Sequence, residues 1–334
     1  MFKGGQIPDM IMILTEINGG KVHPVTYELI GKARELAEKS GMEIACATVC
    51  DNGVDFSEVF ESGCGTVYCI EDSCFKIPQE ELYTENFVPL IKKCKPAVIL
   101  SGATNFGRSL SPRIAAALKT GLTADCTRLE IDDDGRLVQI RPAFSGNILA
   151  HIKSDKLPQM ATIRYKEFAG ADHKDPKKEN IIKIEPYVKE YAKSRILELV
   201  KKADADITEA QVIVAAGRGV KRKEDLDMLK SLADLIGGQL GVTRALVDSG
   251  MADSSIQIGY SGHRVKPKLY IACGISGAPQ HLMGMKESET VIAINSDASA
   301  PIFSFCNHGI VGDLYKVLPE MMESIKEAKG GAQI

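Results

Sequence analysis

KLYIACGISGAPQHLMGM, at residues 268–285, is the stretch that decides the fold of the second half of the chain. It predicts a strand that ends at Gly274, a turn with Gly277, and a helix that starts near Ala278, because proline is tolerated in the first helical turn. The free backbone N–H groups and the positive dipole end of that helix favour the binding of a phosphate group. The glycines let such a group approach the backbone closely. A plain strand–loop–helix connection is the alternative interpretation.

The same alternation of strands and helices extends over residues 211–329. Strands are predicted at 211–217, 239–243, 268–274 and 290–295. The predicted helices are one that carries Leu226, Leu229, Leu232 and Leu235, one over 244–250, one from Ala278, and one from Asp313 to Lys329. This alternation is typical of a parallel sheet with helices on both faces.

An equivalent alternation opens the chain. Strands are predicted at 10–16, 42–50, 66–70 and 97–102, and helices at 27–39, 56–62, 85–94 and 108–120. Four further short strands, at 127–132, 136–143, 147–154 and 158–164, look like antiparallel additions to this first sheet.

The two halves are separated by a polar stretch. Residues 166–210 are rich in charge and poor in apolar runs, apart from a helix predicted at 195–202. We therefore predict an α/β fold with two domains, each a mostly parallel sheet flanked by helices. Residues 1–195 form a nucleotide-binding-like domain, and residues 196–334 form a doubly wound domain that carries the ligand site.

Composition narrows the class of protein. The net charge of −3 gives no basic field, which argues against nucleic acid or an anionic membrane surface as the main partner. No window reaches the ~20 apolar residues of a membrane span, and no export signal is seen, so a cytoplasmic location is expected. The chain has nine cysteines, and because an odd number cannot all pair as disulfides, we expect reduced thiols. The spacing of the cysteines does not predict a metal site.

Two more loops of the second half have ligand-binding character. Arg218 stands between Gly217 and Gly219 after a predicted strand, where an arginine can bind phosphate with two hydrogen bonds. A solvent-facing arginine is the alternative. The glycine-rich run 257–262 has neither a P-loop lysine nor the Gly-x-Gly-x-x-Gly spacing of a dinucleotide fingerprint, so it predicts a ligand-facing loop and no more.

Several single residues are open to two interpretations. His281 is either a ligand contact or a buried, hydrogen-bonded histidine. Asn295 follows a predicted strand, where its carboxamide could meet an adenine or a ribose. Asp313 either caps the last helix or binds a ribose hydroxyl.

Taken together, the motifs resemble the alpha (large) subunit of electron-transfer flavoproteins. The resemblance is close in the second half, and looser over SGATNFGRSLSPRIAAALKTGLTADC (101–126) and RPAFSGNILA (141–150). The quoted stretches of the second half stand in the family's order: GRG (217–219), GVTRALVDSG (241–250), QIGYSGHRVKPKLYIACGISGAPQHLMGM (257–285), AINSDASAPIF (293–303) and HGIVGDLYKVLPEM (308–321).

The resemblance implies an FAD that lies extended across the second domain. Arg218 would face the phosphates, Arg244 the isoalloxazine ring, and Ser261 the flavin N5, where the family commonly has threonine. His281 would reach the pyrimidine carbonyl and, with Arg244, stabilise the negative charge of the reduced ring. The full set of cofactor-binding residues implied in this way is Arg218, Thr243, Arg244, Gln257, Ile258, Gly259, Tyr260, Ser261, Ser276, Gly277, Ala278, Pro279, Gln280, His281, Asn295, Asp313 and Leu314.

The resemblance also implies partners. The family works as a heterodimer with a smaller beta subunit, which the first domain would contact and which holds AMP or, in flavin-bifurcating members, a second FAD that takes hydride from NADH. Acyl-CoA dehydrogenases are the usual redox partners. The chain itself would be an electron carrier without substrate chemistry of its own.

Two other classes of function are weighed against this one. A self-contained nicotinamide-dependent oxidoreductase would need a dinucleotide fingerprint and a catalytic acid or base. A nucleotide-binding regulatory module would bind ATP or AMP in residues 1–195. Colour separates them from a flavoprotein, because only a flavin absorbs visible light.

Overall fold

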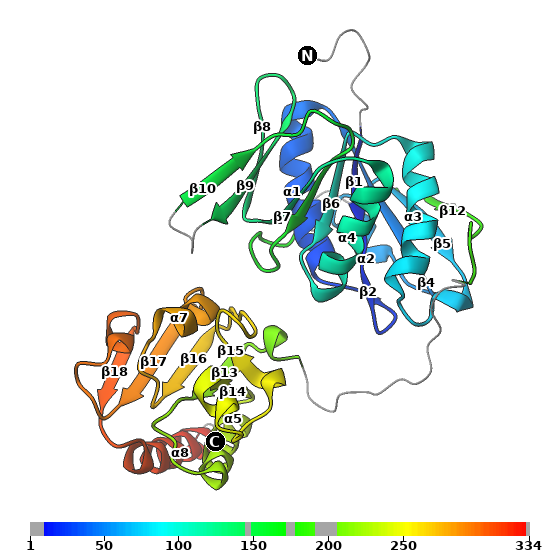
Figure 1. The fold of residues 1–334 in the computed structure, drawn as a ribbon. Coiled ribbons are helices and arrows are strands. Elements are labelled where there is room, and N and C mark those ends of the chain that lie inside the picture. The colour runs from blue at the N-terminus through cyan, green and yellow to red at the C-terminus, as the bar shows by residue number, and fades with distance from the viewer. Residues whose placement is uncertain (1–9, 144–147, 172–177, 191–205, 332–334) are drawn as a thin grey trace. The chain divides into compact units, whose positions relative to one another are not determined.

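The computed structural model describes residues 10–143, 148–171, 178–190 and 206–331. The chain divides into two compact units, Met1–Leu197 and Glu198–Ile334 (Figure 1). The helix predicted at 195–202 lies outside the described residues.

The first unit is built on a seven-stranded parallel sheet. Its strand order is β12-β5-β4-β1-β6-β11-β7, and every neighbouring pair is parallel. The strands are β1 (Met10–Leu14), β4 (Glu43–Cys50), β5 (Thr66–Glu71), β6 (Val98–Gly102), β7 (Leu122–Cys126), β11 (Gln159–Ile163) and β12 (Ile181–Lys183). The alternation in the sequence therefore predicted the architecture correctly.

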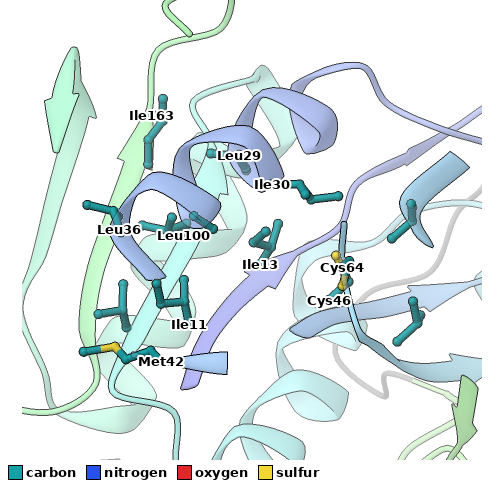
Figure 2. Packing of buried hydrophobic residues seen from close by; sticks show 14 of the residues in the cluster. Ile11, Ile13, Leu29, Ile30, Leu36, Met42, Cys46, Cys64, Leu100 and Ile163 are labelled. Atoms are coloured by element: carbon teal, nitrogen blue, oxygen red, sulfur yellow. The ribbon is translucent and has the colours of Figure 1, made fainter. Parts of the chain in front are cut away.

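Helices cover both faces of this sheet. They are α1 (Val25–Ser40), α2 (Ser57–Glu61), α3 (Glu80–Cys94) and α4 (Asn105–Leu118). Apolar residues at helical spacing turn one side of α1 toward β1, so that Leu29, Ile30 and Leu36 pack on Ile11 and Ile13 (Figure 2). α3 and α4 supply Phe87, Leu90 and Ile114, among others, to the core on the other face.

A small antiparallel sheet is attached to the first unit. It consists of β8 (Arg128–Ile131), β9 (Leu137–Ala143) and β10 (Ile148–Ile152), in the order β10-β9-β8. The antiparallel prediction is right for these strands and wrong for 158–164. That segment is β11, which pairs in parallel with both β6 and β7. All five of its residues are buried, as is typical of an inner parallel strand.

The second unit contains a six-stranded parallel sheet. Its order is β15-β14-β13-β16-β17-β18. The strands are β13 (Val212–Ala216), β14 (Gln239–Thr243), β15 (Gln257–Ile258), β16 (Leu269–Cys273), β17 (Thr290–Asn295) and β18 (His308–Val311), and the helices are α5 (Leu226–Leu235), α6 (Arg244–Asp248), α7 (Pro279–Met285) and α8 (Leu314–Gly331). One core cluster holds residues of α7, and the other holds residues of α5 and α8.

The remaining elements are short. β2 (Ile17–Asn18) and β3 (Lys21–Val22) form a hairpin after β1. Single 3₁₀ turns lie at Ser73–Phe75, Ile207–Glu209, Lys223–Asp225, Ser254–Ile256 and Pro301–Ser304. Pattern reasoning missed β7, β12, β15 and β18, which have two to five residues each, because so few positions show no clear periodicity.

We predict that Leu29→Ala destabilises the first unit. Leu29 is fully buried, and its truncation removes contacts between α1 and β1 and leaves a cavity. The free energy of unfolding is expected to fall by about 2–5 kcal/mol. Hydrogen exchange of the β1 and β4 amides, read by mass spectrometry on the full chain, measures the loss. Glu38→Ala, on the exposed side of α1, is the control and should change it by less than about 0.5 kcal/mol. Equal exchange in the two variants would contradict the packing described.

Candidate functional site

The carboxyl ends of the second unit's strands form one edge of its sheet. β13 lies between β14 and β16, so the direction in which the chain winds reverses between β13 and β16 (Figure 1). In open parallel sheets, ligands bind in the crevice outside the strand ends at such a reversal. The two glycine loops singled out in the sequence follow these two strands.

These two loops touch, backbone to backbone. The N–H of Gly219 donates to the carbonyl oxygen of Gly274 over 3.0 Å. A Cβ at Gly217 would lie 2.4 Å from that oxygen, and a Cβ at Gly219 would lie 2.7 Å from the Cα of Gly274. No side chain fits at these distances, so the contact requires glycine on both sides. Arg218, between the first two glycines, is exposed.

The loop after β16 is held from a second direction. Gly277 has φ +88°, and a Cβ there would lie 2.3 Å from the backbone nitrogen of Ile302. The N–H of Ile302 donates to the carbonyl oxygen of Ser276 over 3.0 Å. The loop thus enters α7 with fixed geometry, and the exposed residues at this point are Ser276, Ala278, Pro279 and Gln280.

Thr243 and Arg244 stand where β14 passes into α6. The Thr243 hydroxyl is buried and has no hydrogen-bond partner within the described part of the chain. The Arg244 side chain is 68% exposed, and its Nε donates to a carboxylate oxygen of Asp248 over 3.3 Å. This corner of the sheet therefore offers an unsatisfied hydroxyl beside an accessible positive charge.

Residues 257–263 form a compact loop around β15, which we call the β15 loop. The Gln257 side-chain amide donates to the Ser261 hydroxyl oxygen over 3.2 Å, and the His263 N–H donates to the Gln257 carbonyl over 2.7 Å. The N–H of Tyr260 donates to the carbonyl of Gln280 over 2.7 Å, which ties the loop to α7. The Tyr260 side chain is 62% exposed, whereas Ile258 and Gly259 are buried.

The His281 ring makes hydrogen bonds within the protein. The side chain is buried, with Nδ1 3.1 Å from the Ile258 carbonyl oxygen and Nε2 3.0 Å from the Tyr270 hydroxyl. Burial lowers the His281 pKa to about 4, so the ring is neutral at pH 7. Both ring nitrogens are used within the protein, and the ring carries no positive charge for a ligand. The buried, hydrogen-bonded interpretation holds in this structure.

The residues expected at the adenosine end serve the fold in part. The Asn295 amide donates to the Ile275 carbonyl over 2.9 Å, and its oxygen accepts from the Asp297 N–H. The Asp313 carboxylate accepts from the N–H of Tyr315, as a helix cap does. Leu314 is buried in the core, next to Gly219 and Gly274.

The structure thus brings the sequence-predicted residues to one edge of the sheet, on the ends of β13, β14, β15, β16 and β17 and at the start of α8. Pattern reasoning missed Tyr270, which bonds His281, and Ile302, which fixes the β16–α7 loop. Tyr270 lies in an apolar strand, where a tyrosine with a polar role has the same pattern as a core residue.

Two family profiles match the chain. The electron transfer flavoprotein domain matches residues 11–188, and the electron transfer flavoprotein FAD-binding domain matches residues 206–286. The second match includes both glycine loops, Thr243, Arg244 and the β15 loop. Among the described residues, no helix is long and apolar enough to cross a membrane.

Curated relatives are similar over nearly the whole chain. The electron transfer flavoprotein subunit alpha of Thermoanaerobacterium thermosaccharolyticum is 44% identical over 96% of this chain and 98% of its own length. The LctC subunit of the lactate dehydrogenase (NAD(+),ferredoxin) of Acetobacterium woodii is 45% identical over 92% of this chain and 74% of its own length. Protein FixB of Rhizobium meliloti is 37% identical over 94% of this chain and 92% of its own length.

The residues at the sheet edge fit the cofactor that the second profile names. The glycine contact lies at the winding reversal, where a pyrophosphate binds in related architectures. The buried Thr243 hydroxyl lacks a partner within the described ranges, and the exposed Arg218 and Arg244 can meet negative charge. These observations and the matches agree that the chain binds FAD and belongs to the alpha-subunit family of electron transfer flavoproteins.

Proposed function

We propose that FAD binds along the carboxyl edge of the second unit's sheet, and that the chain carries electrons between two redox partners while paired with a beta subunit. The observation that carries this proposal is the contact of the two glycine loops at the winding reversal, inside the segment matched by the FAD-binding profile. When bound, FAD supplies the capacity to accept and release electrons.

Each group of residues has a proposed task. Arg218 and the loop from Ser276 to Gln280 bind the pyrophosphate, because the exposed Arg218 and the exposed residues that open α7 lie on two loops that touch each other. Thr243, Arg244 and the β15 loop face the flavin ring, with the Ser261 hydroxyl held by Gln257. Asn295 and Asp313 lie toward the adenosine end, and Leu314 supports the glycine loops from the core.

Charge at the flavin ring comes from Arg244 in this proposal. His281 is neutral and its nitrogens are engaged, so it supports the β15 loop and supplies no positive charge. The Arg244 guanidinium is exposed and positively charged. It therefore stabilises the electron-rich reduced ring over the neutral oxidised one.

The first unit is proposed to contact the beta subunit. The two domains are proposed to span residues 1–195 and 196–334. The protein is proposed to work in the cytoplasm. Two kinds of redox partner are proposed. Family resemblance favours an acyl-CoA dehydrogenase. The LctC relative favours a lactate-oxidising flavoenzyme that uses NAD⁺ and ferredoxin. Reduction of the purified complex by an acyl-CoA with its dehydrogenase, or by lactate with its dehydrogenase, separates the two.

Co-expression with a beta subunit should give a yellow complex, because the second unit binds FAD. Flavin content per heterodimer, measured after acid release, is expected to be at least one. A second FAD in the beta subunit would support the NAD⁺- and ferredoxin-linked role, and AMP there would support the simple carrier. A colourless complex that added FAD does not reconstitute would contradict the proposal.

Arg244→Ala should lower the reduction potential of the bound FAD. Loss of one partly exposed charge near the ring is worth about 1 kcal/mol, or roughly 40 mV for one electron. Stepwise reductive titration, followed by visible absorption, measures the change. Lys230→Ala removes an exposed charge from α5 and is the control, with an expected change below about 10 mV. A potential that is equal in Arg244→Ala and wild type would remove Arg244 from the flavin site.

Gly277→Ala should weaken FAD binding at least tenfold. The new Cβ would lie 2.3 Å from the Ile302 nitrogen, so the loop that enters α7 must move. Gly250→Ala is a matched control, since Gly250 also has positive φ, +71°, but has nothing within 4 Å of its added Cβ. The FAD dissociation constant, from flavin fluorescence on the heterodimer, compares the two. Similar affinities would show that the loop does not contact the cofactor.

A further inference from the structure

The His281 ring connects three separate elements of the second unit. It belongs to α7, lies 3.0 Å from the hydroxyl of Tyr270 in β16, and lies 3.1 Å from the carbonyl oxygen of Ile258 in β15. All three residues are buried. β16 is an inner strand of the sheet and β15 is its edge strand, so this chain of hydrogen bonds reaches from the interior of the unit to its edge.

The chemistry of the partners fixes the position of each proton. A carbonyl oxygen only accepts, so His281 Nδ1 must carry the hydrogen that bonds Ile258. In a neutral ring, Nε2 then has a lone pair and accepts from the Tyr270 O–H. Tyr270 is fully buried, and burial raises its pKa, so the hydroxyl stays protonated and remains a donor.

The β15 loop depends on such contacts because its strand is short. β15 has two residues, which pair with β14 at Val242↔Gln257 and Thr243↔Ile258. The Tyr260 N–H bond to Gln280 and the His281 ring are the two hydrogen-bonded links to α7 that begin within residues 258–260. Close backbone approach completes this packing, since a Cβ at Gly284 would lie 2.4 Å from the nitrogen of Gly259.

We propose that Tyr270 is a positioning residue for the cofactor. Its hydroxyl donates to Nε2 of the His281 tautomer that the Ile258 carbonyl requires, and it thereby holds the ring in the orientation in which Nδ1–H bonds that carbonyl and ties the β15 loop to α7. The inference rests on the proposed function in one respect, that FAD lies against this loop. Tyr270 is fully buried and acts through His281, without touching the cofactor itself.

Tyr270→Phe removes the hydroxyl and keeps the ring. His281 Nε2 then lies in a buried place without a donor, and we expect the ring to turn toward another donor. This rotation releases the Ile258 carbonyl. We expect the FAD dissociation constant to rise about tenfold, as for the loss of one buried hydrogen bond. Tyr83→Phe is the matched control, because the buried Tyr83 hydroxyl donates to the Phe75 carbonyl in the first unit over 3.2 Å.

The test uses the heterodimer with ¹⁵N-labelled histidine. Two-bond ¹H–¹⁵N correlation spectra at pH 7 should show His281 protonated on Nδ1 in the wild type and in Tyr83→Phe, with an Nε2 resonance shifted by the hydrogen bond that Tyr270 donates. In Tyr270→Phe the Nε2 resonance should move toward that of a lone pair without a donor. His281→Asn keeps a donor near the Nδ1 position but needs none from Tyr270. Adding Tyr270→Phe to His281→Asn should therefore weaken FAD binding no further. If Tyr270 had only a structural role, Tyr270→Phe would weaken FAD binding equally in the wild-type and the His281→Asn backgrounds.

Three results would overturn the proposal. They are a wild-type His281 that is protonated on Nε2 or doubly protonated at pH 7, an unchanged Nε2 resonance in Tyr270→Phe, and a full Tyr270→Phe effect on FAD affinity in the His281→Asn background. The wild-type tautomer needs no variant, so it decides the matter even if Tyr270→Phe does not fold. A wild-type heterodimer without FAD would instead refute the proposed function, while the tautomer would still report on the bridge.

Discussion

The second unit depends on the direct contact between the loop after β13 and the loop after β16. Both strands are inner strands of the sheet, and the hydrogen bond from Gly219 to Gly274 continues their pairing past the point where the strands end. No residue with a Cβ could take the places of these glycines without separating the loops. The shared edge, and with it the positions of Arg218 and of the entry to α7, follows from this contact. The Leu314 side chain packs beside Gly219 and Gly274 and so links the contact between the two loops to the last helix.

Much of the fold could be predicted because its signals are local. The run from Lys268 to Gly274 and the helix opening at Ala278 are read from apolar residues, glycine and proline, and the structure has both within a residue or so. The strand at 158–164 shows the limit of this reasoning. Its short apolar sequence fits an antiparallel strand as well as a parallel one. Only the pairing with β6 and β7, whose partner residues lie 61 and 37 to 38 positions earlier, decides between them.

The location of the site could be predicted from the sequence, but the hydrogen bonds of its side chains could be predicted less well. Glycine loops and an arginine mark the edge of the sheet, because parallel strands bring their carboxyl ends together. The state of His281 could not be read in this way. It is set by burial, which favours the neutral ring, and by hydrogen bonds to residues 23 and 11 positions earlier, Ile258 and Tyr270. Asn295 is similar, since its carboxamide is engaged by Ile275 and Asp297 within the fold.

The two-residue pairing of β15 has a consequence for how a holoprotein is assembled. A strand that adds two residues to the edge of a sheet can come away while the five others stay joined, so the β15 loop can open at a small fraction of the free energy of global unfolding. A large, flat cofactor could then enter the second unit after that unit has folded. The polypeptide would not have to wrap around it during synthesis.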